Sequence, residues 1–397
     1  MELISIYLHI PFCEHRCSYC DFNSYAGMSY LIPEYVHALC SEIQYVGRSA
    51  GAKLSVHTIY FGGGTPSLLP LQSLERIMRV IADNYSIQMD CEITLEVNPG
   101  TVTKDYLKGV LSLGVRRLSI GMQSAHSAEL RLLDRIHTFP EVLQSATWAR
   151  QAGCGNLNLD LIYGLPDQKL DDWMRSLELA LGIGPEHLSL YALTLDESTK
   201  LAQWITRGLV TEPDPDLAAD MYELAEEKLD QSGFQSYEIS NWALKDTYGQ
   251  LISCRHNLQY WRGKPYLGFG AGAHGYSDQV RTVNVNTPAI YINNMQEQSE
   301  VEGINFPRSP ANIEVTCLTP EEELAEYMMM GLRLTEEGVG DADFMGRFGV
   351  ALRQRFGAQI QRLVDIGLLE WIDNPESRLR LTRRGRLLGN QVFREFV

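Results

Sequence analysis

The sequence predicts an α/β protein: a partial (β/α)6 barrel of the TIM type, followed by a winged-helix-like α+β domain. Six apolar or β-branched runs alternate with helical segments, in units of roughly 35 residues, which indicates parallel βαβ units. Units of this length favour an open or closed barrel over a flat nucleotide-type sheet, a choice that the sequence alone leaves open. After about residue 318, three helical segments, a possible hairpin and a last helix predict the second domain.

The six predicted strands are short runs of high β propensity. They are ISIYLHI (4–10), TIYFGG (58–63), CEITLEVNP (91–99), RRLSIGMQS (116–124), GNLNLDLIYG (155–164) and HLSLYALT (187–194). Segments with helical periodicity lie between them, such as YLIPEYVHALCSEIQYV, LQSLERIMRVIAD and PEVLQSATWARQAG. In barrels of this kind the chemistry lies on the loops after the strands. Polar residues at these strand ends are therefore the candidate site residues.

We predict three parts along the chain: a core (1–235), a middle region packed on the barrel (236–310) and a C-terminal domain (311–397). The middle region breaks the strand–helix alternation. Its stretch CRHNLQYWRGKPYLGFGAGAHGYS is rich in glycine and aromatic residues, which predicts irregular structure with short strands. The hairpin expected in the last part is LLEWIDNPESRLRLT.

Composition excludes several classes of protein. The formal net charge of -16 argues against general nucleic-acid binding, which needs a basic face. The arginine run from Arg378 to Arg386 is therefore expected to be a solvated face or a docking surface. No apolar run approaches the roughly 18 residues that span a bilayer. MELISIYLHI lacks the features of a signal peptide, so the cytoplasm is the simplest compartment.

Three of the eight cysteines, Cys13, Cys17 and Cys20, share one short loop with the spacing C-x3-C-x2-C. A disulfide framework would suit a small secreted chain better than this one, and the five scattered cysteines are expected to be buried. Three thiolates on one loop can bind a thiophilic metal. Zinc would take His9 or His15 as a fourth ligand. The spacing favours a [4Fe–4S] cluster, in which one iron is left open for another ligand.

Other strand ends carry weaker signals. The glycines of YFGGGTPS let the backbone approach a ligand closely, although a tight βα turn explains them equally well. Glu96 could bind ribose hydroxyls, or could be a salt-bridged surface residue. Asp160 lies on an apolar strand, where burial is costly unless the carboxyl is paired. Gln123 ends the fourth strand, and Arg135 follows in the next helical stretch.

Taken together, these motifs resemble the radical S-adenosylmethionine (SAM) enzymes of the coproporphyrinogen-oxidase-like branch. The resemblance rests on Y-x-H-I-P-F-C-x3-C-x2-C, GGGTP, E-V-N-P, G-x-Q-S, R-I-H and L-D-L-I-Y-G-L-P, in this order, and covers essentially the whole chain. It implies a radical SAM barrel whose three cysteines hold a [4Fe–4S] cluster, with SAM completing the fourth iron and open to cleavage to a 5′-deoxyadenosyl radical. The cofactor residues that it implies are Tyr7, Tyr19, Gly63, Gly64, Thr65, Glu96, Gln123, Arg135, Asp160 and Ala192.

Two kinds of protein in this branch compete. One is the oxygen-independent coproporphyrinogen III oxidase, which removes two propionate carboxyls in haem synthesis. The other is the HemW-like haem chaperone, which binds haem and delivers it to haemoproteins. The oxidases typically add a fourth cysteine to the motif and a long N-terminal extension. Here Asp21 and Phe22 follow Cys20, and only a dozen residues precede Cys13, so both features favour the chaperone.

The stretch CRHNLQYW (254–261) resembles the haem-binding H-N-x-x-Y-W motif of the chaperones. A porphyrin could be ligated by a histidine and stacked by aromatic rings. The implied haem-binding residues are His256, Asn257, Tyr260 and Trp261, with Cys254 and His274 as further candidate ligands. The alternative is a structural loop in which the polar residues cap backbone groups and the aromatic residues fill a core.

The main hypothesis is thus a haem chaperone with a radical SAM core, in which the cofactor site could serve regulation or transfer. The resemblance implies a client haemoprotein, such as a membrane respiratory protein, and allows a homodimer. An electron donor such as flavodoxin or ferredoxin would be needed if SAM is cleaved. The alternatives are a coproporphyrinogen III oxidase and a non-catalytic zinc protein.

Overall fold

The computed structural model describes residues 3–297, 305–373 and 376–397. These residues form two compact units. Unit 1 contains the described residues up to Lys228 together with Pro265–Thr316, and unit 2 contains Leu229–Lys264 and Cys317–Val397. The predicted middle region (236–310) is therefore divided, because its second half contributes strands to the sheet of unit 1 while its first half belongs to unit 2.

Unit 1 is built on the six predicted strands, which are confirmed and run parallel in chain order. They are β1 (Leu3–Ile10), β4 (Ser55–Gly63), β5 (Ser86–Val97), β6 (Arg117–Gln123), β7 (Asn156–Tyr163) and β8 (His187–Ala192). Along β6 and β7 buried apolar residues such as Leu118 and Leu159 alternate with polar ones such as Ser119 and Asn158, so the two faces of these strands differ in polarity.

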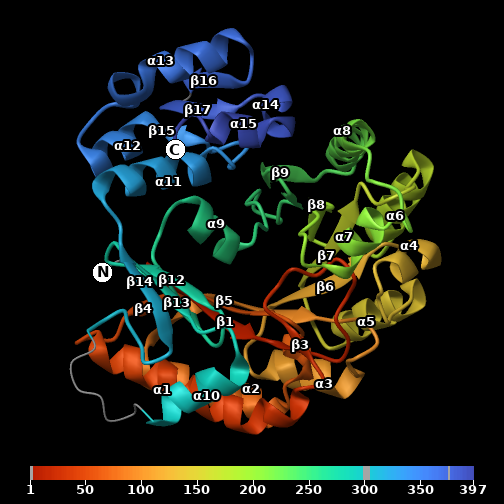
Figure 1. The fold of residues 1–397 in the computed structure, drawn as a ribbon, viewed down its shortest axis with the longest axis vertical. Coiled ribbons are helices and arrows are strands. Elements are labelled where there is room, and N and C mark those ends of the chain that lie inside the picture. Colours follow the sequence, from red (N-terminus) through yellow and green to blue (C-terminus); the bar gives the residue numbers. More distant parts are fainter. Residues whose placement is uncertain (1–2, 298–304, 374–375) are drawn as a thin grey trace. The chain divides into compact units, whose positions relative to one another are not determined.

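The helices of unit 1 follow the strands, as the βαβ pattern predicts. They are α1 (Ile32–Ser49), α2 (Leu71–Asn84), α3 (Lys104–Ser112), α4 (Ser127–Leu132), α5 (Phe139–Gln151), α6 (Leu170–Gly182) and α7 (Lys200–Thr206), and α8 (Pro215–Gln231) runs on into unit 2. Helix α2 buries Leu74, Ile77 and Ile81, which share one face of the helix. Figure 1 shows α1, α2 and α10 (Pro288–Glu297) along one side of the strands.

The barrel is open, because the second neighbour of β1 is β11 (Tyr266–Phe269) and not β8. Strand β11 pairs in parallel with β1 and continues into an antiparallel series. That series is formed by β12 (His274–Ser277), β13 (Val280–Asn284) and, at the edge, β14 (Asn312–Cys317). β11, β12 and β13 are the short strands expected in the middle region, whereas β14 lies in the stretch that was predicted to belong to the C-terminal domain (311–397). All four extend the sheet beyond the six-strand core.

Unit 2 contains the predicted winged-helix-like arrangement. Its three helices are α11 (Pro320–Gly331), α12 (Asp341–Phe348) and α13 (Leu352–Asp365), followed by the antiparallel pair β16 (Leu369–Asp373) and β17 (Ser377–Leu381). The turn of this hairpin, 374–375, lies outside the described residues. The remaining elements are β9 (Gln235–Glu238), β10 (Asn241–Ala243), α9 (Arg255–Trp261), β15 (Val339–Gly340), α14 (Arg383–Leu387) and α15 (Gly389–Phe393).

The arginine run on and after β17 is engaged within unit 2. Arg378 lies 3.4 Å from a carboxylate oxygen of Asp343, and Arg380 lies 2.8 Å from Glu370 and 3.1 Å from Glu336. These ion pairs compensate much of the local positive charge. Among the described residues, no helix is both long enough and apolar enough to cross a membrane.

Candidate functional site

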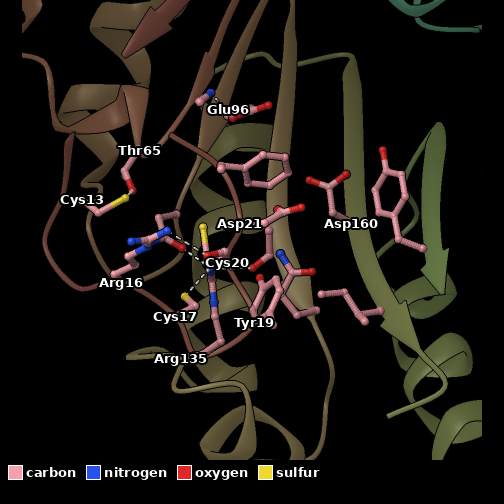
Figure 2. A pocket seen from close by; sticks show the side chains of 18 of the residues that line it. Cys13, Arg16, Cys17, Tyr19, Cys20, Asp21, Thr65, Glu96, Arg135 and Asp160 are labelled. Atoms are coloured by element: carbon pink, nitrogen blue, oxygen red, sulfur yellow. Dashed lines mark hydrogen bonds between the residues drawn. The ribbon is translucent and has the colours of Figure 1, made fainter. Parts of the chain in front are cut away.

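A cavity in unit 1 opens at the carboxyl ends of the parallel strands and on the loop after β1 (Figure 2). It gathers the predicted cluster and cofactor residues from six different strand ends and loops. Those that line it are Cys13, Cys17, Tyr19, Cys20, Gly63, Gly64, Thr65, Glu96, Gln123, Arg135, Asp160 and Ala192. Because the ends of parallel strands meet at one edge of a sheet, residues 180 positions apart reach the same space.

The cysteine loop is tied down on both sides of its second cysteine. Ser18 donates its backbone N–H to the Leu133 carbonyl at 3.1 Å and its hydroxyl to the Leu132 carbonyl at 2.7 Å. The Leu201 N–H in turn donates to the Ser18 carbonyl at 2.8 Å. Arg16 adds a bond to the Cys20 carbonyl at 3.2 Å. These backbone and side-chain hydrogen bonds give the loop a defined shape.

Each thiol of the loop contacts a polar group of the cavity. The Thr65 hydroxyl donates to the Cys13 sulfur at 3.6 Å, and the Arg135 guanidinium donates to the Cys17 sulfur at 3.5 Å. The Cys20 sulfur lies 3.6 Å from the Ser24 hydroxyl. Burial raises the pKa of the Cys13 and Cys17 thiols, so thiolates here need a cationic partner. The three sulfurs and their hydrogen-bond donors fit an iron–sulfur cluster, whose irons would supply that charge.

The histidines proposed as a fourth zinc ligand are otherwise engaged. His9 uses both ring nitrogens, at 3.0 Å from the Tyr7 hydroxyl and at 2.8 Å from the Asn23 carbonyl. His15 lies with Nε2 3.0 Å from an Asp134 carboxylate oxygen. His9 has both ring nitrogens engaged and the His15 Nε2 lies against Asp134, although His15 lines the cavity, so these contacts favour the cluster over a single zinc ion.

The glycine turn after β4 packs against the cysteine loop. Gly63 has φ +116°, and a Cβ on it would lie 2.7 Å from the His9 ring. A Cβ on Gly64 would lie 2.7 Å from the Phe12 carbonyl oxygen and 3.0 Å from the Cys13 sulfur. The N–H groups of Gly64 and Thr65 donate to the Ile10 and Phe12 carbonyls at 2.9 and 2.8 Å. The absence of side chains here thus serves a tight turn, and it also opens the cavity beside the thiols.

Two buried acids face the cavity from β5 and β7. Glu96 accepts hydrogen bonds from the Tyr60 hydroxyl at 2.9 Å and from the Gly63 N–H at 3.1 Å. Burial, with a further contribution from the Asp160 charge, raises the pKa of Glu96 to about 7. Burial also raises the pKa of Asp160. Glu96 is therefore a site carboxyl and not a salt-bridged surface residue.

Arg135 and Gln123 both line the cavity. The Arg135 guanidinium donates to the Gly121 carbonyl at 3.0 Å and to the Asn98 side chain, besides the Cys17 sulfur. Gln123 ends β6 with φ +62°, a conformation that turns the chain out of the strand. The Arg135 Nε–H also donates to the His137 Nδ1 at 3.3 Å, so all three nitrogens of the guanidinium already bind protein groups.

Tyr7 differs from the other predicted cofactor residues, because it is not among the described residues that line this cavity. Its hydroxyl bonds to His9, and its ring stacks on Tyr60 with centroids 6.2 Å apart. Tyr60, Asn98 and Ser119 line the cavity but were not predicted. Their sequence signal is the alternation of polar side chains near the ends of otherwise apolar strands.

The predicted haem motif lies on α9 of unit 2, where the sequence had indicated irregular structure. Helical i,i+4 spacing puts His256 and Tyr260 on one face, with the His256 Nε2 2.9 Å from the Tyr260 hydroxyl. His256 is 2% exposed, and the Arg333 guanidinium lies 4.5 Å from the centroid of the Trp261 ring. Asn257 lies on the same helix, and the reserve candidate His274 is exposed on β12 of unit 1.

Comparisons with known proteins agree with this site. The sequence profile of the Radical SAM superfamily matches residues 7–180, and that of the HemN C-terminal domain matches residues 318–388. The solved structure titled "Coproporphyrinogen III oxidase (HemN) from Escherichia coli is a Radical SAM enzyme" has a similar fold, with a TM-score of 0.82 over 100% of this chain and 90% of that chain. At 23% identity, that likeness concerns the fold alone.

Full-length relatives carry the name Heme chaperone HemW. The protein of that name from Bacillus subtilis is 38% identical over 395 residues, which cover 99% of each chain. The one from Haemophilus influenzae is 38% identical and spans 99% of this chain and 98% of its own. With this identity over the full length, and with the superfamily profile covering the cysteine loop and the strand ends, the chain belongs to the HemW family of the radical SAM superfamily.

Proposed function

We propose that this protein is a haem chaperone of the cytoplasm, which binds haem and transfers it to haemoproteins, and which carries a [4Fe–4S] cluster and SAM on its radical SAM core. The observation that carries the proposal is the cavity in which three thiols meet two buried acids and a guanidinium. Asp21 and Phe22 line that cavity where the oxidases have a further cysteine. The full-length HemW relatives support the choice of chaperone over oxidase.

Within unit 1, the protein side chains have distinct tasks. Cys13, Cys17 and Cys20 would hold the cluster, and the Arg135 guanidinium beside Cys17 would offset its negative charge. Binding of the SAM carboxylate by Arg135 would require one of its present hydrogen bonds to open. Glu96 and Asp160 would accept hydrogen bonds from the ribose hydroxyls of SAM. When bound, the cluster supplies one electron that can cleave SAM, for which a donor such as flavodoxin or ferredoxin would be required.

Within unit 2, we assign haem contact to α9, through His256, Asn257, Tyr260 and Trp261. The His256 Nε2 is held by the Tyr260 hydroxyl, so ligation of haem iron through this atom requires that bond to open. Arg333 covers one face of the Trp261 ring, which leaves the opposite face or the edge for a porphyrin. The client would be a haemoprotein, such as a membrane respiratory protein, and the chaperone could act as a homodimer.

Anaerobic reconstitution with iron and sulfide, followed by haem titration and coproporphyrinogen III turnover on the same sample, tests the proposal. The variant is His256→Ala, and His37→Ala, on the exposed side of α1, is the matched control for haem bound by a surface histidine. We expect haem binding without turnover, weakened at least tenfold in His256→Ala and unchanged in the control. Turnover to protoporphyrinogen would make this protein an oxidase. Equal haem binding by both variants would remove His256 from the haem site.

A further inference from the structure

A buried polar network lies beneath Asp160, between strands β6, β7 and β8. Its centre is Asn158, which is 1% exposed and lies two residues before Asp160 on the same face of β7. The Asn158 amide nitrogen lies 2.7 Å from the Asp160 Oδ1 and 2.6 Å from the Ser119 hydroxyl. Its amide oxygen lies 2.6 Å from the His187 Nδ1 and 3.1 Å from the Ser189 hydroxyl. All four hydrogen-bonding positions of this side chain are therefore occupied.

The network has a fixed direction. An ionised Asp160 can only accept hydrogen bonds, so Asn158 must turn its NH2 group toward it and its oxygen toward His187. His187 must then carry its proton on Nδ1, and burial lowers the pKa of this imidazole, which keeps the ring neutral. The Ser119 hydroxyl, 3.0 Å from the Asp160 Oδ2, holds the second carboxylate oxygen. The Asp160 carboxylate thus accepts hydrogen bonds from Asn158 and Ser119, the Ser189 hydroxyl also lies within its reach, and the residue lines the cavity.

We propose that Asn158 is a positioning residue for the cofactor site, which holds the Asp160 carboxylate as an acceptor for the hydroxyl groups of an adenosyl ligand. This inference rests on the proposed SAM site. The sequence motifs did not include Asn158, and the expectation that site residues lie at strand ends did not point to it either. Asn158 lies within the strand and is not among the described residues that line the cavity. Its hydrogen bond orients the Asp160 carboxyl and lowers the pKa of that carboxyl against the rise that burial causes.

Other charged groups act on Asp160 and enter the test. Glu96 acts on it from β5, Arg117 from β6 and Tyr19 from the cysteine loop, whereas His187 on β8 contacts Asn158. Arg117 favours the ionised carboxylate, whereas the negative charge of Glu96 opposes it. A change at Asn158 also alters the contacts of its amide with Ser119, His187 and Ser189. The comparison of Asn158→Leu with Asn158→Asp across pH therefore separates the loss of the donor to Asp160 from the loss of those contacts.

The experiment is SAM titration by calorimetry into anaerobically reconstituted protein at pH 6.5, 7.5 and 8.5. Asn158→Leu keeps the size of the side chain but removes the donor to Asp160, and we expect about tenfold to hundredfold weaker SAM binding. Asn158→Asp should bind SAM within a few fold of wild type at pH 6.5, because a protonated carboxyl can still donate. Its affinity should fall at least tenfold relative to wild type by pH 8.5, as the new carboxyl ionises and repels Asp160.

Thr94→Val is the matched control. Thr94 is a fully buried polar residue on β5, and its hydroxyl has no hydrogen-bond partner among the described residues. We expect this variant to bind SAM as wild type does. It removes a buried hydroxyl from the same sheet without touching the network, so it measures the effect of a general change in the strand interior.

The outcomes separate two failures. If wild type binds SAM and Asn158→Leu binds it within twofold at every pH, the positioning role is refuted and the cofactor site stands. If wild type does not bind SAM, both the site and the inference are wrong. If Asn158→Leu does not fold, Asn158→Asp decides: affinity that parallels wild type from pH 6.5 to 8.5 would refute the role, because a structural effect alone predicts no divergence with pH.

Discussion

Replacing Glu96 by glutamine should make the cluster-free protein more stable at high pH and not at low pH. The Glu96 carboxyl is buried beside Asp160, and its pKa rises from 4.5 to about 7. A group whose pKa is raised on folding favours the folded state below its unfolded pKa, and this contribution is lost as the pH rises through about 7. Glutamine keeps the shape of the side chain and removes the titration.

The size of the effect follows from the pKa. A rise from 4.5 to about 7 corresponds to about 3 kcal/mol, because one pKa unit is about 1.4 kcal/mol. Glu96 is partly exposed to the cavity, so solvent makes this an upper value. Because the loss already begins above the unfolded pKa of 4.5, only about 2 kcal/mol of it falls between pH 5.5 and 8.5. At about 2–4 °C per kcal/mol for a large domain, the melting temperature of Glu96→Gln should gain up to about 8 °C on wild type over this range.

Thermal melting of the cluster-free proteins across this pH range measures the effect. Any cost of the weakened hydrogen bond from Gly63 is the same at every pH. The test is therefore how the difference in melting temperature between variant and wild type changes with pH. Glu34→Gln, at an exposed position on α1, is the control and should follow wild type. A constant difference between Glu96→Gln and wild type from pH 5.5 to 8.5 would refute a raised pKa at Glu96.

Three further predictions follow from the same contacts. Gly63→Ala should destabilise the protein by about 1–3 kcal/mol in urea unfolding, because of its positive φ and the approach to His9, whereas Gly155→Ala, with open space around it, should not. Arg135→Met should lower the iron content after reconstitution, since it removes the cation beside the second cysteine; iron equal to wild type would contradict this. Tyr260→Phe should strengthen haem binding severalfold, because it removes the hydroxyl bonded to the His256 Nε2, and weaker binding in a titration would show that the hydroxyl contacts haem instead.

Much of unit 1 could be predicted because its signals are local. Short β-branched runs, each followed by a segment with helical periodicity, located all six strands. The expectation that site residues lie at strand ends correctly placed Glu96 and Asp160 in one cavity. Asp160, an acid on an otherwise apolar strand, was expected to need hydrogen-bond partners, and Asn158 and Ser119 donate to it.

The remaining features depend on pairings between distant residues, which local patterns do not contain. Strand β11 pairs with β1 across more than half the chain, so the sheet is longer than the predicted barrel. The motif around His256 forms a helix although its composition is typical of a loop. Tyr7 lies next to a cavity residue, at a position that depends on its contact with Tyr60. The network around Asn158 likewise exists only through the register of β6, β7 and β8.

Transfer of haem to an acceptor protein tests the central claim most directly. The reconstituted protein is loaded with one equivalent of haem and mixed anaerobically with increasing concentrations of a haem-free client haemoprotein, and the transfer rate is followed by absorbance. A chaperone that docks its client predicts a rate that rises with acceptor concentration. A rate that stays constant at the spontaneous release rate of haem would contradict the account, because haem would then leave the protein without any transfer step.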